Sequence, residues 1–171
     1  MKQISALLLL AASTTLVSAE TPKPAPTDPK VAQLVGRWEG TTKFEIRGDK
    51  GDWKTTAACE RTAIGGAVTC SLVAVNKESR LEEVWLFGYD KATDAYHLFT
   101  TNNWGEAYDH AATWTDAKTV SFVHTGTRDG KALREEYKLA FAGKDDFTIT
   151  GIISLDGKPF AQGVTTAKRV R

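Results

Sequence analysis

The chain has 171 residues, of which 42% are hydrophobic, 25% are charged and 9% are aromatic, a mixture typical of one globular domain. This composition excludes a disordered chain, a collagen-like fibre and a multi-span membrane protein. The 22 Lys and Arg residues nearly balance the 21 Asp and Glu residues. Because no bulk positive field results, nucleic acid and anionic membranes are disfavoured as partners.

Residues 1–19 have the pattern of an export signal. Lys2 supplies a positive charge, residues 4–12 are apolar, and Val17-Ser18-Ala19 matches the pattern that signal peptidase reads. The apolar stretch is too short to span a bilayer. We therefore expect cleavage before Glu20, export to the periplasm or the medium, and no stable membrane insertion.

A proline-rich segment follows at residues 20–30 and contains four of the five prolines. It lacks apolar bulk, which predicts an extended tether in front of a folded domain at residues 31–171. Near its end, Asp28 suits the N-cap of a helix, and Pro29 suits the first helical position. The sequence therefore predicts one short helix over residues 29–35.

From Arg37 onward, apolar and polar residues alternate in short runs, the pattern of half-buried strands. Turn residues separate these runs at positions 47–52, 64–66, 90–94, 115–118, 129–131, 143–146 and 156–158. The spacing predicts about ten strands without a helical crossover. We therefore expect an all-β fold, either an antiparallel up-and-down β-barrel or a β-sandwich, and the short connections favour the barrel.

Cys59 and Cys70 flank the turn residues Ile64-Gly65. A two-residue turn centred there places the cysteines directly opposite each other, and an exported protein favours their oxidation to a disulfide. A turn centred on Gly65-Gly66 would break this register and leave two small buried thiols. The pair lacks C-x-x-C spacing, so we interpret it as structural rather than redox-active.

The segment around Trp38 carries a resemblance to a known fold. Gly36-Arg37-Trp38 is a G-x-W motif between the predicted helix and the first strand, and it resembles the opening of lipocalin-like barrels. The order of Leu86-Phe87-Gly88-Tyr89-Asp90, Tyr96 and Trp114-Thr115-Asp116 is similar to that in a bacterial lipocalin-like domain family of unknown function. The resemblance implies an up-and-down barrel with an internal cavity, and it implies no established activity.

The resemblance also implies structural roles. In lipocalin-like barrels the Trp of this motif points inward at the closed end, and an Arg near the end of the last strand packs across its ring. Gly36 and Trp38 match the motif, and Arg169 or Arg171 stands where that Arg is expected. The alternative is that Trp38 is an ordinary core residue of a β-sandwich.

Strict alternation extends the inward assignment along the strands. If Trp38 points inward, then Phe44 does so too, and inward-facing sets in later strands contain further aromatic and polar side chains. Inward glycines and alanines favour empty space, so we predict a mostly apolar cavity for a small apolar ligand. The candidate ligand-binding residues are Phe44, His97, Phe122, His124, Glu135 and Tyr137.

Other chemistry has less support in the sequence. His97, Asp109, His124 and Glu135 would suit a metal only if all pointed inward, and they lack metal-ligand spacing. No nucleophile elbow, P-loop or dinucleotide motif is present. We therefore predict no catalytic residue, no metal ligand and no cofactor.

Two alternative functions stay open. The first is an enzyme that uses an acid or base in the cavity, although Glu82-Glu83 and Glu135-Glu136 can each send at most one side chain inward. The second is a cell-envelope interaction module with a filled core. Trp53 and Trp104 would anchor a partner in that module, whereas they would form the rim of the cavity in a ligand-binding barrel.

Overall fold

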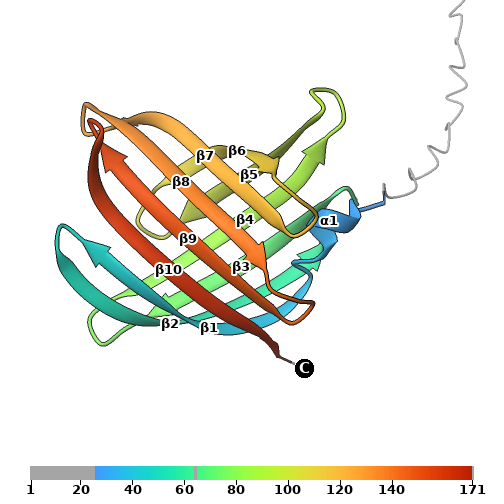
Figure 1. The fold of residues 1–171 in the computed structure, drawn as a ribbon, viewed down its shortest axis with the longest axis horizontal. Helices are drawn as coiled ribbons and strands as arrows, with labels where there is room; N and C mark the ends of the chain where they lie inside the picture. The colour runs from blue at the N-terminus through green and yellow to red at the C-terminus, as the bar shows by residue number, and fades with distance from the viewer. Residues whose placement is uncertain (1–25, 64, 171) are drawn as a thin grey trace, which may run out of the picture.

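The structure is a computed structural model that describes residues 26–63 and 65–170. Within these residues the chain forms a closed barrel of ten antiparallel strands, in which consecutive strands pair and β1 pairs with β10 (Figure 1). The strands are β1 Gly36–Ile46, β2 Asp49–Arg61, β3 Ala67–Val75, β4 Arg80–Asp90, β5 Ala95–Asn102, β6 Ala107–Trp114, β7 Thr119–Arg128, β8 Lys131–Phe141, β9 Asp146–Leu155 and β10 Lys158–Val170. The predicted all-β, up-and-down barrel is confirmed. The expected export signal and residues 20–25 of the tether lie outside the described residues.

Tight turns join the strands where the sequence offers residues that tolerate a left-handed backbone. Asp129 and Asp156 have φ angles of 52° and 50°, and each is followed by a glycine with positive φ. The connection between β3 and β4 was not among the predicted turns. There, the Asn76 side chain accepts hydrogen bonds from the backbone N–H groups of Glu78 and Ser79 at 2.8 and 2.7 Å, an Asx turn.

Strands β2 and β3 pair Cys59 directly with Cys70. The two residues form a disulfide with a Cα–Cα distance of 4.0 Å. The predicted register is therefore correct, and the alternative register with two free thiols is not adopted. The bond joins two strands that are already neighbours, so it reinforces the wall of the barrel.

A short helix, α1 (Pro29–Ala32), covers one end of the barrel and ends earlier than predicted. Asp28 caps it by accepting a hydrogen bond from the Lys30 backbone N–H at 2.7 Å. The other carboxylate oxygen of Asp28 accepts a bond from the Tyr96 hydroxyl at 3.0 Å. Val31 and Leu34 are buried, so this segment closes the barrel with apolar side chains.

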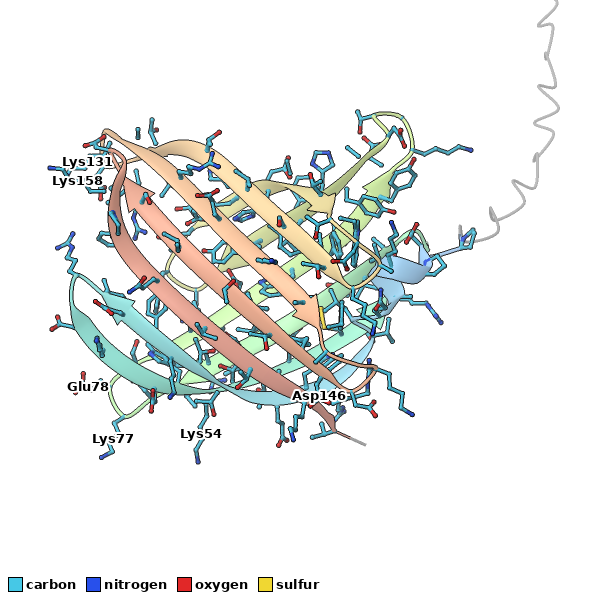
Figure 2. The ribbon with its side chains drawn as sticks, in the orientation of Figure 1. Lys54, Lys77, Glu78, Lys131, Asp146 and Lys158 are labelled. Atoms are coloured by element: carbon cyan, nitrogen blue, oxygen red, sulfur yellow. A yellow bond between two sulfur atoms is a disulfide. The ribbon has the colours of Figure 1, made fainter. Side chains whose placement is uncertain are left out.

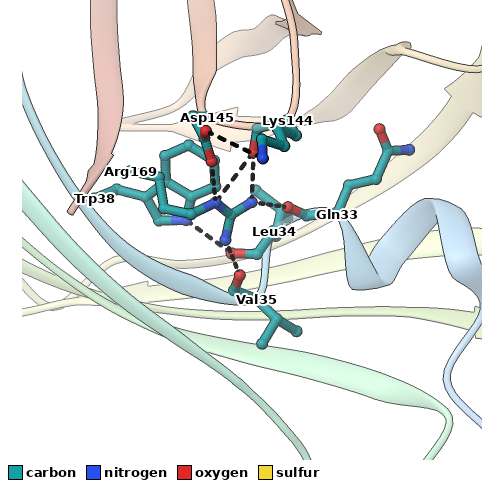
Figure 3. Close-up of polar contacts among 7 residues, drawn as sticks. All are labelled: Gln33, Leu34, Val35, Trp38, Lys144, Asp145 and Arg169. Atoms are coloured by element: carbon teal, nitrogen blue, oxygen red, sulfur yellow. Dashed lines mark hydrogen bonds and ion pairs between the residues drawn. The ribbon is translucent and has the colours of Figure 1, made fainter. Parts of the chain in front are cut away.

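Trp38 lies beneath this helical segment, and Arg169 of β10 packs across its ring at 4.1 Å from the centroid (Figure 3). The indole N–H of Trp38 donates to the carbonyl oxygen of Leu34 at 2.8 Å. This is the arrangement that the lipocalin-like resemblance implies. Arg171, the other arginine considered for this role, lies outside the described residues.

The Arg169 guanidinium also donates hydrogen bonds to three backbone carbonyl oxygens (Figure 3). It donates to the carbonyl oxygens of Gln33 at 3.0 Å and Lys144 at 2.9 Å, and to that of Val35. Gly36 adopts a φ of 137°, and a side chain there would collide with this guanidinium. The closed end is therefore joined by polar contacts as well as by apolar packing.

Most of the charged side chains lie on the outside of the barrel. Lys54, Lys77 and Glu78 project away from the strands or from a hairpin tip (Figure 2). In the described part of the chain, no helix has the length and apolar character needed to cross a membrane. The apolar core instead faces the barrel interior, where Phe87, Val120, Leu139 and their neighbours are buried.

Candidate functional site

The barrel encloses a cavity of about 220 Å³ beside the Trp38 end. Inward-facing side chains from all ten described strands form its wall. Apolar and aromatic residues make up most of this wall, among them Leu34, Ala57, Leu72, Trp85, Leu98, Phe122, Phe147 and Ile149. A mostly apolar, concave interior with a few polar groups is the usual form of a small-molecule site.

Inward glycines do not create this space, contrary to the reasoning from sequence. The Tyr137 ring lies over its strand partner Gly151, and the Phe44 ring lies over its partner Gly163. Aromatic side chains therefore occupy the volume that the glycines leave. The cavity persists because a closed barrel of this many strands is too wide for its own side chains to fill completely.

Four of the six predicted ligand-binding residues line the cavity: Phe44, Phe122, Glu135 and Tyr137. His97 is not among the residues that line the cavity. Its neighbour Leu98 faces inward, so His97 lies on the outer face, where its Nδ1 is 3.1 Å from the Asp109 carboxylate. Alternation allows only one of two adjacent strand residues to face the interior.

His124 lies beside the cavity without lining it. Its Nδ1 is 2.8 Å from the backbone carbonyl oxygen of Asp109, and its ring packs on Tyr108 with 4.7 Å between centroids. Asp109 itself lies on the outer face with His97. The set of four metal-ligating side chains considered from sequence is therefore divided between the two faces of the sheet.

A buried pair of His110 and Glu135 was missed by the sequence reasoning. The two residues are 1% and 3% exposed, and His110 Nε2 is 3.0 Å from a Glu135 carboxylate oxygen. His110 Nδ1 is 3.3 Å from the Leu98 carbonyl oxygen, which can only accept, so Nδ1 carries a hydrogen. The contact with Glu135 then needs a second proton on either Nε2 or the carboxyl group, and the pair is neutral as a unit.

Glu83 is a further carboxylate in the cavity wall. The Trp85 indole N–H donates to its Oε2 at 2.6 Å. The pKa of Glu83 is raised from the ordinary 4.5 to about 6, chiefly by burial and also by the nearby Glu135 charge, against the lowering effects of the Trp85 hydrogen bond and of His110. The ionised Glu83 carboxylate is therefore held in an unfavourable environment at neutral pH.

Replacing Glu83 with Gln is expected to raise the free energy of unfolding by about 2 kcal/mol at about pH 8. The folded-state pKa of about 6 lies above the unfolded value of 4.5, so the cost of ionised Glu83 is present above pH 6 and absent below pH 4.5. Urea unfolding at both ends of this range measures the difference. Glu82→Gln, on the outer face, is the control, and a Glu83→Gln protein less stable than wild type at the higher pH would contradict the assignment.

Two tryptophans stand at the end of the cavity opposite Trp38. Trp53 of β2 and Trp104 of the loop between β5 and β6 both line it, with 6.5 Å between ring centroids. Trp104 is half exposed. Beside them, Arg128 pairs with Glu106 at 2.7 Å. The two exposed aromatics singled out from sequence therefore belong to the rim of the cavity.

The Tyr137 hydroxyl adds an uncharged polar group to the wall. Burial raises the pKa of Tyr137 well above its usual value, so the hydroxyl stays protonated. It makes no hydrogen bond to any of the described residues. Among residues 26–63 and 65–170, no three His, Cys, Asp or Glu side chains group closely enough to hold a metal ion. The cavity thus offers an apolar interior, carboxylates and hydroxyl groups, that of Tyr137 among them.

No protein-family model and no curated protein matches the chain. Among solved structures, the S-type phycobiliprotein lyase from Guillardia theta is similar, with a TM-score of 0.58 and 13% identity over 82% of this chain and 90% of that chain. A redesigned β-barrel matches 86% of this chain and 100% of its own at 11% identity and a TM-score of 0.39. A protein of unknown function from the DUF3598 family of Nostoc punctiforme matches 82% of this chain and 98% of its own at 12% identity and a TM-score of 0.28. The likeness to the lyase concerns the fold alone, which in this chain is a closed barrel of ten antiparallel strands within the described residues.

Proposed function

We propose that this protein binds a small, mainly apolar molecule inside its barrel. The cavity of about 220 Å³, with its apolar and aromatic wall, is the observation that carries the proposal. Trp53 and Trp104 at its rim support it, because rigid aromatic side chains shield an apolar ligand from water. The enclosed space argues against the alternative of an interaction module with a filled core.

Filling the cavity from Ala57 is the direct test of this function. Ala57 lines the cavity, whereas its neighbour Ala58 is exposed on the outer face of the same strand. Ala57→Phe is expected to weaken binding of the fluorescent apolar probe N-phenylnaphthylamine by at least about tenfold. Ala58→Phe is the matched control and is expected to leave probe affinity unchanged.

Probe fluorescence titrated against folded protein measures both dissociation constants. Circular dichroism of each variant confirms that the barrel is intact before the titration is compared. Equal affinity of wild type and Ala57→Phe would show that the probe binds elsewhere, and binding inside the barrel would then be rejected.

In the same proposal the protein acts in the periplasm or the external medium. Residues 1–19 match an export signal, and the Cys59–Cys70 disulfide suits an oxidising compartment. The intact mass of the protein purified from its own host tests this part. A mature chain that begins at Glu20 supports export, and a full-length chain retaining Met1 or Lys2 argues against it.

A further inference from the structure

We infer that the barrel selects an amphipathic amine, an apolar chain that carries a protonated amino group, over the corresponding carboxylate. This inference rests on the proposed function and names the chemical class of the ligand. It follows from the charges in the cavity wall and from the polar atoms that the barrel leaves without partners.

The wall contains three carboxylates, Glu83, Glu106 and Glu135. Arg128 pairs with Glu106 at 2.7 Å, and His110 contacts Glu135 at 3.0 Å. In the described part of the chain, Glu83 alone of the three has no cationic partner. A positive group on the ligand would give Glu83 the cationic partner that the other two carboxylates already have. A buried charge is stabilised strongly by an opposite charge at close range.

The hydrogen bonds of Glu83 also leave room for a ligand. Trp85 donates to Oε2, while Oε1 accepts no hydrogen bond from the described residues. Trp85 itself lines the cavity beside Glu83, and the face of an indole ring attracts a cation. The Glu83 carboxylate and the Trp85 ring together form a part of the cavity wall that attracts a cation, whereas most of the wall is apolar.

Tyr137 provides the second, independent observation. Its side chain is deep in the barrel and lines the cavity, yet its hydroxyl has no hydrogen-bond partner among the described residues. The hydroxyl is open to the cavity, so it is free to accept a hydrogen bond from a polar group of a ligand. An ammonium has three N–H donors, enough for the Glu83 carboxylate and the Tyr137 oxygen together.

The same wall disfavours an anionic ligand. A carboxylate inside the cavity would approach Glu83, the wall carboxylate without a cationic contact among the described residues, and like charges in a low-dielectric interior repel. Both cations near the cavity, Arg128 and the protonated form of His110, are already in contact with a carboxylate of the protein. The barrel therefore discriminates by charge as well as by apolar character.

A matched series of octyl compounds tests the inference. Octylamine, octanol and octanoate share one chain and differ only in the head group, and each is titrated against the folded protein by calorimetry at about pH 7.5. We expect octylamine to bind at least about tenfold more tightly than octanoate, with octanol between them. Glu83→Gln is expected to weaken octylamine binding by about tenfold and to change octanol binding much less.

Glu82→Gln is the control variant, because it removes the same charge from the adjacent residue on the outer face, where Glu82 contacts Arg80. It should leave all three affinities unchanged. A preference for octylamine that is equally strong in Glu83→Gln overturns the inference.

The wild-type protein provides a test that does not depend on the variant folding. Three titratable groups face Glu83: Glu135 of β8, His110 of β6, and Glu106 in the loop before β6. Glu106 in turn forms an ion pair with Arg128 of β7. Since the pKa of Glu83 is about 6, its negative charge is lost as the pH falls from about 7.5 to about 5. Octylamine should bind more weakly at the lower pH, whereas octanol should not; an unchanged amine preference contradicts the role of Glu83.

The series also separates the inference from the proposed function. If octanol and N-phenylnaphthylamine bind but octanoate binds as tightly as octylamine, the barrel is a ligand-binding protein and the inference about amines is wrong. If neither the octyl compounds nor the naphthylamine probe binds, the proposed function itself is rejected, and the inference is rejected with it.

Discussion

Replacing Trp38 with Ala is expected to lower the free energy of unfolding by about 4 kcal/mol, as for a large aromatic side chain removed from a core. Trp38 is 1% exposed and packs on Phe147 with 4.7 Å between ring centroids. Its indole N–H donates a hydrogen bond to the Leu34 carbonyl oxygen, and its ring makes a cation–π contact with the Arg169 guanidinium. The substitution therefore removes apolar packing, a buried hydrogen bond and the cation–π contact together.

Urea unfolding followed by circular dichroism measures this loss. Trp38→Phe is the matched variant, because it keeps an aromatic ring beneath Arg169 and removes the N–H donor to Leu34. The free energy of unfolding of Trp38→Phe should fall by less, about 1–2 kcal/mol, because the Leu34 carbonyl loses its buried hydrogen-bond donor and the phenyl ring is smaller than the indole. A loss below about 1 kcal/mol in Trp38→Ala would contradict the role of Trp38 in closing the barrel.

Replacing His110 with Leu is expected to destabilise the barrel by about 3–5 kcal/mol, because it leaves Glu135 buried without its partner. Both side chains are almost fully buried, and their contact is 3.0 Å long. Replacing both residues with Leu removes the His110 imidazole and the Glu135 carboxyl group together, so neither is left buried without its partner. The double variant should therefore be markedly more stable than either single variant.

A double-mutant cycle from urea unfolding measures the coupling between His110 and Glu135. The outer face offers a matched control in Glu136, which pairs with Arg134 at 2.7 Å where both side chains are half exposed. Glu136→Leu should change stability by less than about 1 kcal/mol, as expected for a surface ion pair. Additive losses for His110→Leu and Glu135→Leu would contradict a coupled pair in the barrel interior.

Much of the fold could be predicted because it depends on local chemistry. Turn residues such as Asp156-Gly157 favour tight hairpins, and hairpins without crossovers predict neighbouring antiparallel strands. Counting residues from the turn was enough to set Cys59 opposite Cys70. In strands where apolar and polar residues alternate clearly, as around Phe122 and Leu139, the inward face could also be assigned.

The candidate site was predicted less completely, for a physical reason. In each strand, alternate residues form two sets that point to opposite faces of the sheet. The sequence shows which set faces the interior only when one set is polar and the other is apolar. In β5 and β6 both sets of alternate residues contain polar or aromatic side chains, so the sequence could not show that His97 lies on the outer face and His110 in the interior. Pairing with neighbouring strands decides which set faces inward.

The sequence by itself determined the all-β class of fold and the order of the hairpins, and it offered the cysteine register as one of two alternatives. The resemblance to lipocalin-like barrels implied the pairing of the G-x-W motif with an arginine near the end of the chain. Only the tertiary structure decided that the sheet closes and that Tyr137 and Phe44 cover the inward glycines. It also decided that Glu83, His110 and Glu135 meet in one apolar interior. These side chains come from three different strands, so their distances depend on the curvature and stagger of the closed sheet, which no local pattern records.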